Sequence, residues 1–333
     1  MKKAFFPVIA GALFSIILLG GMWLFFQKST EGIDLQEAGT QKKYERHYVM
    51  IAEDAASTLW QEIYKSAAQE AEDSDVYLEL VDSDAMAEYT LEDFLRISIA
   101  SKVDGIIMQP NGSEQGRKLI HEAAQNKIPV VTALEDDSES ERISFVGMNS
   151  YQMGSAYGEA ILKNLEEEDT NVLVLIGSDK RDTGTSIIVS QLMNDVREKT
   201  ENVNISLYNI NTDGNFELEE AIRDVFVNQK ELPDLLVCLD EMITECAYQA
   251  IVDYNQVGNV DIIGYYESDN VLDSIKKGTI ASTISFSTDE IGRYSVNALN
   301  EYHLLGHVSN YFNVTLRTIN VGNVVSVMMN KEK

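Results

Sequence analysis

Acidic side chains directly follow two short apolar runs of this chain. Glu53–Asp54 comes after Tyr48–Ala52, and Glu135–Asp136 follows Val130–Leu134. An ionised carboxylate only accepts hydrogen bonds, so neighbouring carboxylates suit a ligand that offers vicinal hydroxyl groups. Because ligands of open α/β sheets bind outside the carboxyl ends of the strands, these positions are the first candidates for function.

The sequence lacks the common motifs of enzymatic sites. It contains no G-x-x-x-x-G-K-[ST], no G-x-G-x-x-G after an apolar run, no H-E-x-x-H and no G-x-S-x-G. We therefore expect a protein that is not an enzyme and that holds neither a cofactor nor a metal. Two cysteines cannot build a disulfide framework, so the fold must depend on hydrophobic cores.

The charge of the chain excludes one class of partner. Among 333 residues, 54 are Asp or Glu and 26 are Lys or Arg, which gives a net charge of −28. A phosphate backbone would be repelled by this field, so we expect no nucleic-acid partner. The length is that of about two globular units.

The N-terminal segment predicts export. Lys2 and Lys3 precede an uncharged run, Ala4–Phe26, that is long enough to cross a bilayer. The residues after it offer neither a small-residue cleavage site nor a cysteine for a lipid, which favours an uncleaved signal anchor over 1–28 and a polar linker over 29–43. A cleaved signal peptide is the alternative. The expected location is the cell membrane, as a single-pass protein with an extracytoplasmic ectodomain.

The rest of the chain alternates short apolar runs with amphipathic stretches. This pattern predicts an α/β fold with parallel sheets and helices on both faces, arranged as a closed barrel or as two doubly wound sheets. A very short strand at Phe145–Gly147 favours two lobes. Thr58 with Gln61 predicts a capping box, and Ser113 and Asn149 are expected to cap further helices.

Several segments resemble the type I periplasmic binding proteins, in particular their ribose/galactose-like branch. They are VDGIIMQP (103–110), IPVVTA (128–133), FVGMNSYQMG (145–154), CLDEMITECAYQAI (238–251) and DIIGYYESDNVLDSIKKGTIASTIS (261–285). The resemblance implies two Rossmann-like, doubly wound lobes joined by three hinge crossings, with a small molecule clamped between them. The implied lobes are 44–148 plus 287–312 and 149–286 plus 313–330.

The same resemblance implies a set of ligand-binding residues. It places a sugar-stacking aromatic at Trp60, for which a place in the helix core is an equally open alternative, and Asn149 at the first crossing. The candidates are Glu53, Asp54, Ser57, Trp60, Glu135, Asp136, Asn149, Asp182, Thr185, Asp240, Tyr266 and Phe286.

In the second lobe the resemblance weakens. Val189, Leu239, Tyr266 and Phe286 stand where ribose binders carry polar contacts, so this wall of the site is expected to be more apolar. Without an arginine at the matched position, an anionic ligand would meet several carboxylates. We expect a neutral saccharide or polyol-like ligand, with sugar phosphates and uronic acids disfavoured.

The partners follow from the resemblance and the anchor. The expected function is substrate binding for ABC-type sugar uptake, with an ABC permease as partner. A ligand-sensing module for a membrane histidine kinase is the alternative. Arg142, Lys180 and Arg181 are assigned to the surface.

Overall fold

The computed structural model describes residues 43–52, 54–81, 89–165, 170–177, 183–210, 215–228 and 232–331. The chain divides into two units, Met1–Tyr44 and Glu45–Lys333, and the second contains nearly all of the described residues. The expected signal anchor and most of the linker lie outside the described residues. Within the described part of the chain, no helix has both the length and the apolar character needed to cross a membrane.

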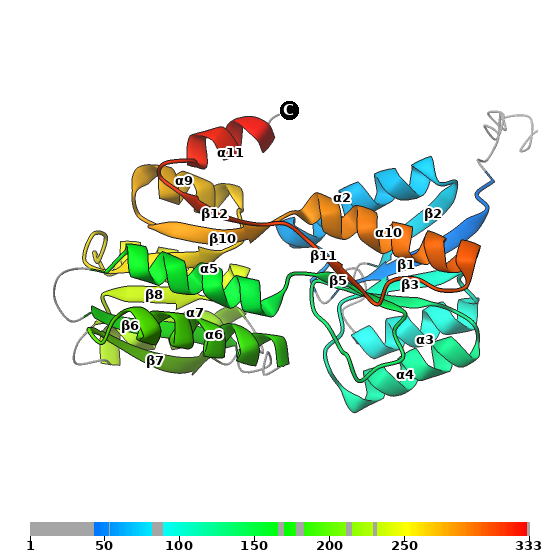
Figure 1. Cartoon of the computed structure of the whole chain (residues 1–333), viewed down its shortest axis with the longest axis horizontal. Coiled ribbons are helices and arrows are strands. Elements are labelled where there is room, and N and C mark those ends of the chain that lie inside the picture. The colour runs from blue at the N-terminus through cyan, green and yellow to red at the C-terminus, as the bar shows by residue number, and fades with distance from the viewer. Residues whose placement is uncertain are drawn as a thin grey trace, which may run out of the picture. The chain divides into compact units, whose positions relative to one another are not determined.

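Two six-stranded sheets organise the unit from Glu45 onward (Figure 1). The first has the strand order β11-β5-β4-β3-β1-β2, and all its strands run parallel. Its strands are β1 Arg46–Ile51, β2 Val76–Val81, β3 Gly105–Met108, β4 Val130–Ala133, β5 Ser144–Gly147 and β11 Tyr311–Asn313.

The second sheet has the order β12-β10-β9-β8-β6-β7. Five strands are parallel, and the edge strand β12 runs antiparallel to β10. Its strands are β6 Thr170–Gly177, β7 Val203–Ile210, β8 Leu235–Cys238, β9 Asp261–Tyr265, β10 Ser282–Phe286 and β12 Leu316–Asn320. The two sheets define two lobes, which confirms the expected fold class.

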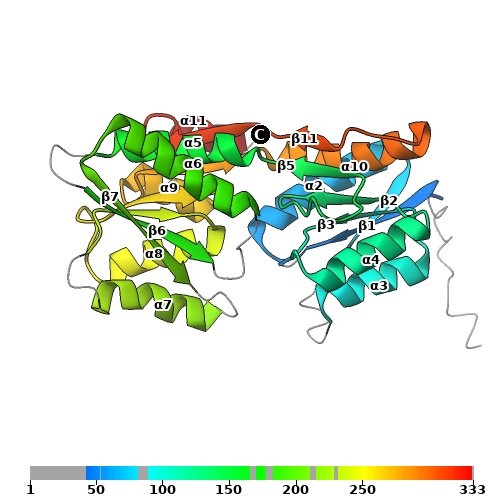
Figure 2. The ribbon, with the colours of Figure 1, turned by 60° about the horizontal axis from the view of Figure 1, so that its bottom comes forward.

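Helices cover both faces of the first sheet (Figure 2). They are α2 Thr58–Asp73, α3 Leu91–Ser101, α4 Glu114–Gln125 and α10 Thr288–Leu305. Side chains of α2 and α10 pack in one core with Tyr48 and Met50, while α3 and α4 pack with Val49 and Ile51 in another. The split follows from the strand geometry, because successive side chains point to opposite faces.

The second sheet is covered in the same way. Its helices are α5 Ser150–Lys163, α6 Thr183–Lys199, α7 Asn215–Asn228, α8 Glu241–Asp253, α9 Asp269–Lys277 and α11 Val324–Lys331. Residues of α5 and α6 share a core with Val172 and Val174, and residues of α7, α8, α9 and α11 share one with Leu173 and Leu175. Four apolar cores therefore hold the two lobes.

The chain passes between the sheets three times. It leaves the first sheet after β5, returns from β10 into α10, and crosses again between β11 and β12. These crossings fall where the resemblance implies hinges. The lobe boundaries drawn from the sequence stay a prediction.

Local hydrogen bonds decide where the helices begin. Ser113 and Asn149 cap α4 and α5 as expected. The expected capping box at Thr58 is wrong, because α2 starts at Thr58 and the cap is Ser57, whose hydroxyl accepts the Trp60 N–H at 3.3 Å. A cap must keep an extended backbone, and Ser57 does so with φ −60° and ψ 150°.

We predict that Gln41–Lys333 folds without the N-terminal segment, because both described sheets and their helices begin at or after Arg46. The purified fragment should unfold cooperatively on heating, as followed by circular dichroism. Its midpoint should match that of the full chain in detergent micelles. A fragment recovered only as aggregate, beside a folded full chain, would contradict the prediction.

Candidate functional site

The candidate residues gather at the carboxyl ends of the strands. In the first lobe, Asp54 lies after β1 and Glu135 after β4, and Gln109, which is not one of the candidates, follows β3 between them. In the second, Asp240 follows β8 and Tyr266 follows β9. Parallel strands bring these ends to one edge of each sheet, so the topology alone collects the polar groups there.

A chain of hydrogen bonds links Trp60 to Glu135. The indole Nε1 donates to Gln109 Oε1 at 3.0 Å, and Gln109 Nε2 donates to Glu135 Oε1 at 3.2 Å. Trp60 is only 2% exposed and belongs to the core beneath α2 and α10. Contact of this indole with a ligand stays a prediction, because in this structure its N–H already has a protein acceptor.

Gln109 is a residue that sequence reasoning missed. Its side chain is 5% exposed, and it orients both Trp60 and Glu135. One signal was present in the sequence, since a polar residue stood directly after the buried run Gly105–Met108.

Asp136 is paired within the protein. Arg142 donates to both of its carboxylate oxygens, with Nη2 at 2.8 Å from Oδ2, and also donates from Nη1 to the carbonyl of Asn310 at 3.0 Å. The Arg142 side chain is 12% exposed, so it is more covered than its assignment to the surface implies. The cause is this bidentate pairing, which the one-dimensional sequence does not reveal.

Three further candidates act as helix caps. Ser57 caps α2, Asn149 Oδ1 accepts the Gln152 N–H at 3.0 Å, and Asp240 Oδ1 accepts the Met242 N–H at 2.9 Å. Caps satisfy backbone donors that the first turn leaves unpaired. These side chains therefore have a structural role here, and a role in ligand contact remains a prediction.

The two aromatic candidates of the second lobe are fully buried. Tyr266 and Phe286 are 0% and 1% exposed, their ring centroids are 5.6 Å apart, and both belong to the core of the first lobe. The Tyr266 hydroxyl donates to Glu62 of α2. Burial and this hydrogen bond raise the pKa of Tyr266. An apolar wall formed by these rings against a ligand stays a prediction.

Two candidates, Glu53 and Asp182, lie outside the described residues, as do Lys180 and Arg181. Thr185 lies half-buried in the first turn of α6. A role in binding stays a prediction for all three candidates.

Carboxylates from both lobes influence one another around the first turn of α8. Burial raises the pKa of Glu241, in the first turn of α8, to about 7, helped by the negative charges of Glu245, Asp240, Asp54 and Glu62. Asp54 and Glu62 belong to the first lobe and the other three to the second. Sequence reasoning missed Glu241 and Glu62, since their proximity depends on the tertiary fold.

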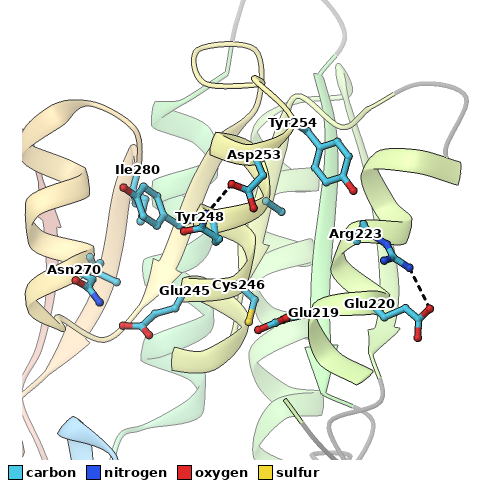
Figure 3. Close-up of a pocket in the computed structure, with 13 residues that line it drawn as sticks. Glu219, Glu220, Arg223, Glu245, Cys246, Tyr248, Asp253, Tyr254, Asn270 and Ile280 are labelled. Carbon is cyan, nitrogen blue, oxygen red and sulfur yellow. Dashed lines mark hydrogen bonds and ion pairs between the residues drawn. The ribbon is translucent and has the colours of Figure 1, made fainter. Parts of the chain in front are cut away.

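A cavity lies away from these strand ends. Its volume is about 780 Å³, and it lies between α7, α8 and α9 (Figure 3). Its lining includes Glu219, Glu245, Cys246, Tyr248 and Tyr254. It opens among helices and not at the strand ends, and it shares Glu245 with the carboxylates around Glu241.

The fold and site define a two-lobed α/β protein whose polar groups converge at the carboxyl ends of two parallel-dominated sheets. Residues 48–305 match the family of the periplasmic binding protein domain. The match spans most of the chain, so this protein belongs to that family. The resemblance to type I periplasmic binding proteins is thereby confirmed.

Solved structures show the same fold. The chain is 22% identical to a protein in the structure of the XylFII–LytSN complex, with a TM-score of 0.70 over 83% of this chain and 98% of that one. GanP, a glucose-galactose binding protein from Geobacillus stearothermophilus, is 21% identical, with a TM-score of 0.73 over 84% of this chain and 98% of its own.

A third similar structure is the Caulobacter myo-inositol binding protein bound to myo-inositol. It is 14% identical, with a TM-score of 0.75 over 86% of this chain and 97% of its own. Identities this low establish the fold alone. No curated protein matches this chain.

We predict that Glu241→Gln stabilises the protein at alkaline pH. The native state keeps a proton on Glu241 up to pH about 7, whereas the unfolded chain releases it near the ordinary value for Glu. Native stability is therefore lost as pH rises through this window. Since the carboxyl is partly solvated, we expect a gain of about 1–2 kcal/mol at pH 8 and almost none at pH 4.

Urea unfolding of the Gln41–Lys333 fragment at both pH values measures this difference. Glu201→Gln, a change at an exposed residue of the same lobe, is the matched control and should leave the free energy of unfolding unchanged at both pH values. An equal gain at both pH values would show that Glu241 does not titrate in this window.

Proposed function

We propose that this protein is an extracytoplasmic receptor that clamps a small neutral molecule, a saccharide or related polyol, between its two lobes. The observation that carries the proposal is the meeting of carboxylates from both lobes at the strand ends, where Asp54 and Glu62 add to the charge felt by Glu241. Carboxylates accept hydrogen bonds from hydroxyl groups, and a ligand between the lobes would reach acceptors on both sides.

The charge balance supports a ligand without negative charge. Three cations among the described residues are already paired with acids: Arg142 with Asp136, Arg317 with Glu267 and Lys331 with Glu62. An anionic group would have to lose its hydration beside carboxylates, which is costly. Phosphorylated and carboxylated sugars are therefore disfavoured.

The comparisons support the same ligand class. The neighbours described as binding glucose and galactose or myo-inositol take neutral, hydroxyl-rich molecules. We transfer this chemistry to the present chain as part of the proposal, together with its expected binding residues.

The proposal includes membrane anchoring through the N-terminal segment. Ala4–Phe26 has the length of a spanning helix, and two lysines precede it. We propose that it remains uncleaved and holds the ectodomain on the outer side of the cell membrane.

We propose delivery of the ligand to an ABC permease as the primary role. Family membership supports this role, since one similar structure is an ABC transporter periplasmic solute binding protein with bound D-allose. The second candidate is ligand sensing through a membrane histidine kinase. It is favoured by the expected protein anchor in place of a lipid and by the similarity to the protein in the XylFII–LytSN complex.

We predict that neutral sugars or polyols, and not their phosphates, bind the Gln41–Lys333 fragment. At 100 times Kd, a ligand should raise the free energy of unfolding by about 2.7 kcal/mol. A thermal-shift screen finds the binder, and calorimetry compares it with its phosphorylated or oxidised analogue. A tighter-binding anionic analogue would overturn the assignment of ligand class.

A gene deletion separates the two roles. If the protein feeds a permease, deletion should reduce uptake of the labelled ligand at least tenfold, because the permease loses its receptor. Re-expression of the full chain should restore uptake. Normal uptake combined with a lost transcriptional response to the ligand would instead support the sensing role.

A further inference from the structure

Tyr266 has its backbone in one lobe and its side chain in the other. Its N–H donates to the carbonyl of Ile284 at 2.9 Å, and its carbonyl accepts from Thr283 Oγ1 at 2.6 Å, so the main chain is fixed to β10 of the second sheet. The ring lies fully buried in the core of the first lobe. A single residue thus connects the two lobes.

An unusual backbone conformation directs this side chain. Tyr266 has φ +65°, in the left-handed region that bulky residues rarely adopt. Such strain persists only where the surrounding structure enforces it, and it collects at functional positions. Here the enforcing contacts are the two hydrogen bonds to β10 and the packing against Phe286.

Glu62 of α2 accepts from three partners at once. The Tyr266 hydroxyl donates to Oε2, Thr288 Oγ1 lies 3.3 Å from the same atom, and Lys331 Nζ lies 2.9 Å from Oε1. Tyr266 and Lys331 belong to the second lobe, whereas Glu62 and Thr288 belong to the first. When the lobes separate here, Glu62 loses its two partners from the second lobe, Tyr266 and Lys331, and keeps only Thr288.

The Lys331 end of this cluster is anchored in the second lobe. Lys331 Nζ also donates to the carbonyl of Glu267 at 2.9 Å. The Glu267 carboxylate is itself buried and accepts from Arg317 of β12 and from Ser285 of β10, the latter at 2.7 Å. The segment after β9 is therefore bound to two strands of its own sheet.

We propose that Tyr266, Glu62 and Lys331 form a latch that holds the two lobes together. Opening beside the latch would draw a buried ring out of an apolar core and leave Glu62 without its cross-lobe donors. Both events disfavour the open arrangement, so the latch sets how often the lobes separate. This inference rests on the fold and not on the proposed ligand, partner or anchor.

Hydrogen exchange of the ligand-free full chain in detergent micelles tests the latch. Tyr266→Phe keeps the ring and removes the hydroxyl, so we expect at least tenfold faster exchange in peptides covering 58–66 and 287–291. Tyr151→Phe is the matched control, because Tyr151 is 60% exposed on α5, and it should leave these peptides unchanged.

Two further variants separate a latch from a purely structural role. Glu62→Gln keeps an acceptor for Tyr266 but loses the ion pair with Lys331, so exchange should rise about threefold, as it should in Lys331→Met. The centres of β1 and β6 should stay protected in every variant, because opening between the lobes leaves both sheets intact.

Three results would overturn the proposal. The first is unchanged exchange near the crossings in Tyr266→Phe. The second is equally faster exchange in all peptides, including β1 and β6, which would mean that the hydroxyl only stabilises the fold as a whole. The third is a pair of outcomes. The Tyr266→Phe variant fails to fold, and the Glu62→Gln and Lys331→Met variants exchange like the unmodified chain.

Discussion

Neither sheet of this protein is made from one continuous stretch of chain. β11 completes the first sheet only after the chain has passed through five strands of the second, and β12 then completes the second. The cores next to the crossings must therefore form from chain segments that precede and follow the other lobe. Phe286 and Val314, which flank two crossings, are 1% and 0% exposed and belong to the core of the first lobe. Residues beside the crossings are therefore also core residues, so any rotation of one lobe against the other would have to repack this core.

Negative charge imposes a second constraint on the same region. The chain carries 54 acids against 26 Lys and Arg, so unpaired carboxylates near the crossings would repel one another. In the described structure, specific ion pairs reduce this repulsion, among them Arg142–Asp136 and Arg317–Glu267. Where pairing is weaker, as at Glu241, burial and neighbouring acids shift the protonation equilibrium. Fold and titration are therefore coupled at the strand ends.

The sequence predicts the order of strands and helices well, because periodicity and capping residues act over a few positions. Ser113 and Asn149 are helix caps, as the sequence predicts. The cap of α2 was expected at Thr58 and is the adjacent Ser57, an error of one position. Contacts between distant positions are not readable in this way. The bond from Trp60 to Gln109 joins residues 49 positions apart, and the bond from Tyr266 to Glu62 joins residues 204 apart.

The position of a polar residue at a strand end therefore does not decide its role. Asp240 follows β8 as expected of a ligand-contacting residue, yet it caps α8. Tyr266 follows β9, yet its backbone angle φ of +65° directs its side chain into the other lobe. The hydrophobic pattern of a sequence does not predict the sign of φ at a single residue. The resemblance to the family predicts which residues lie at the carboxyl ends of the strands. The competition between protein donors and ligand donors for the same acceptors then determines which side chains remain for binding, and that competition is resolved only in three dimensions.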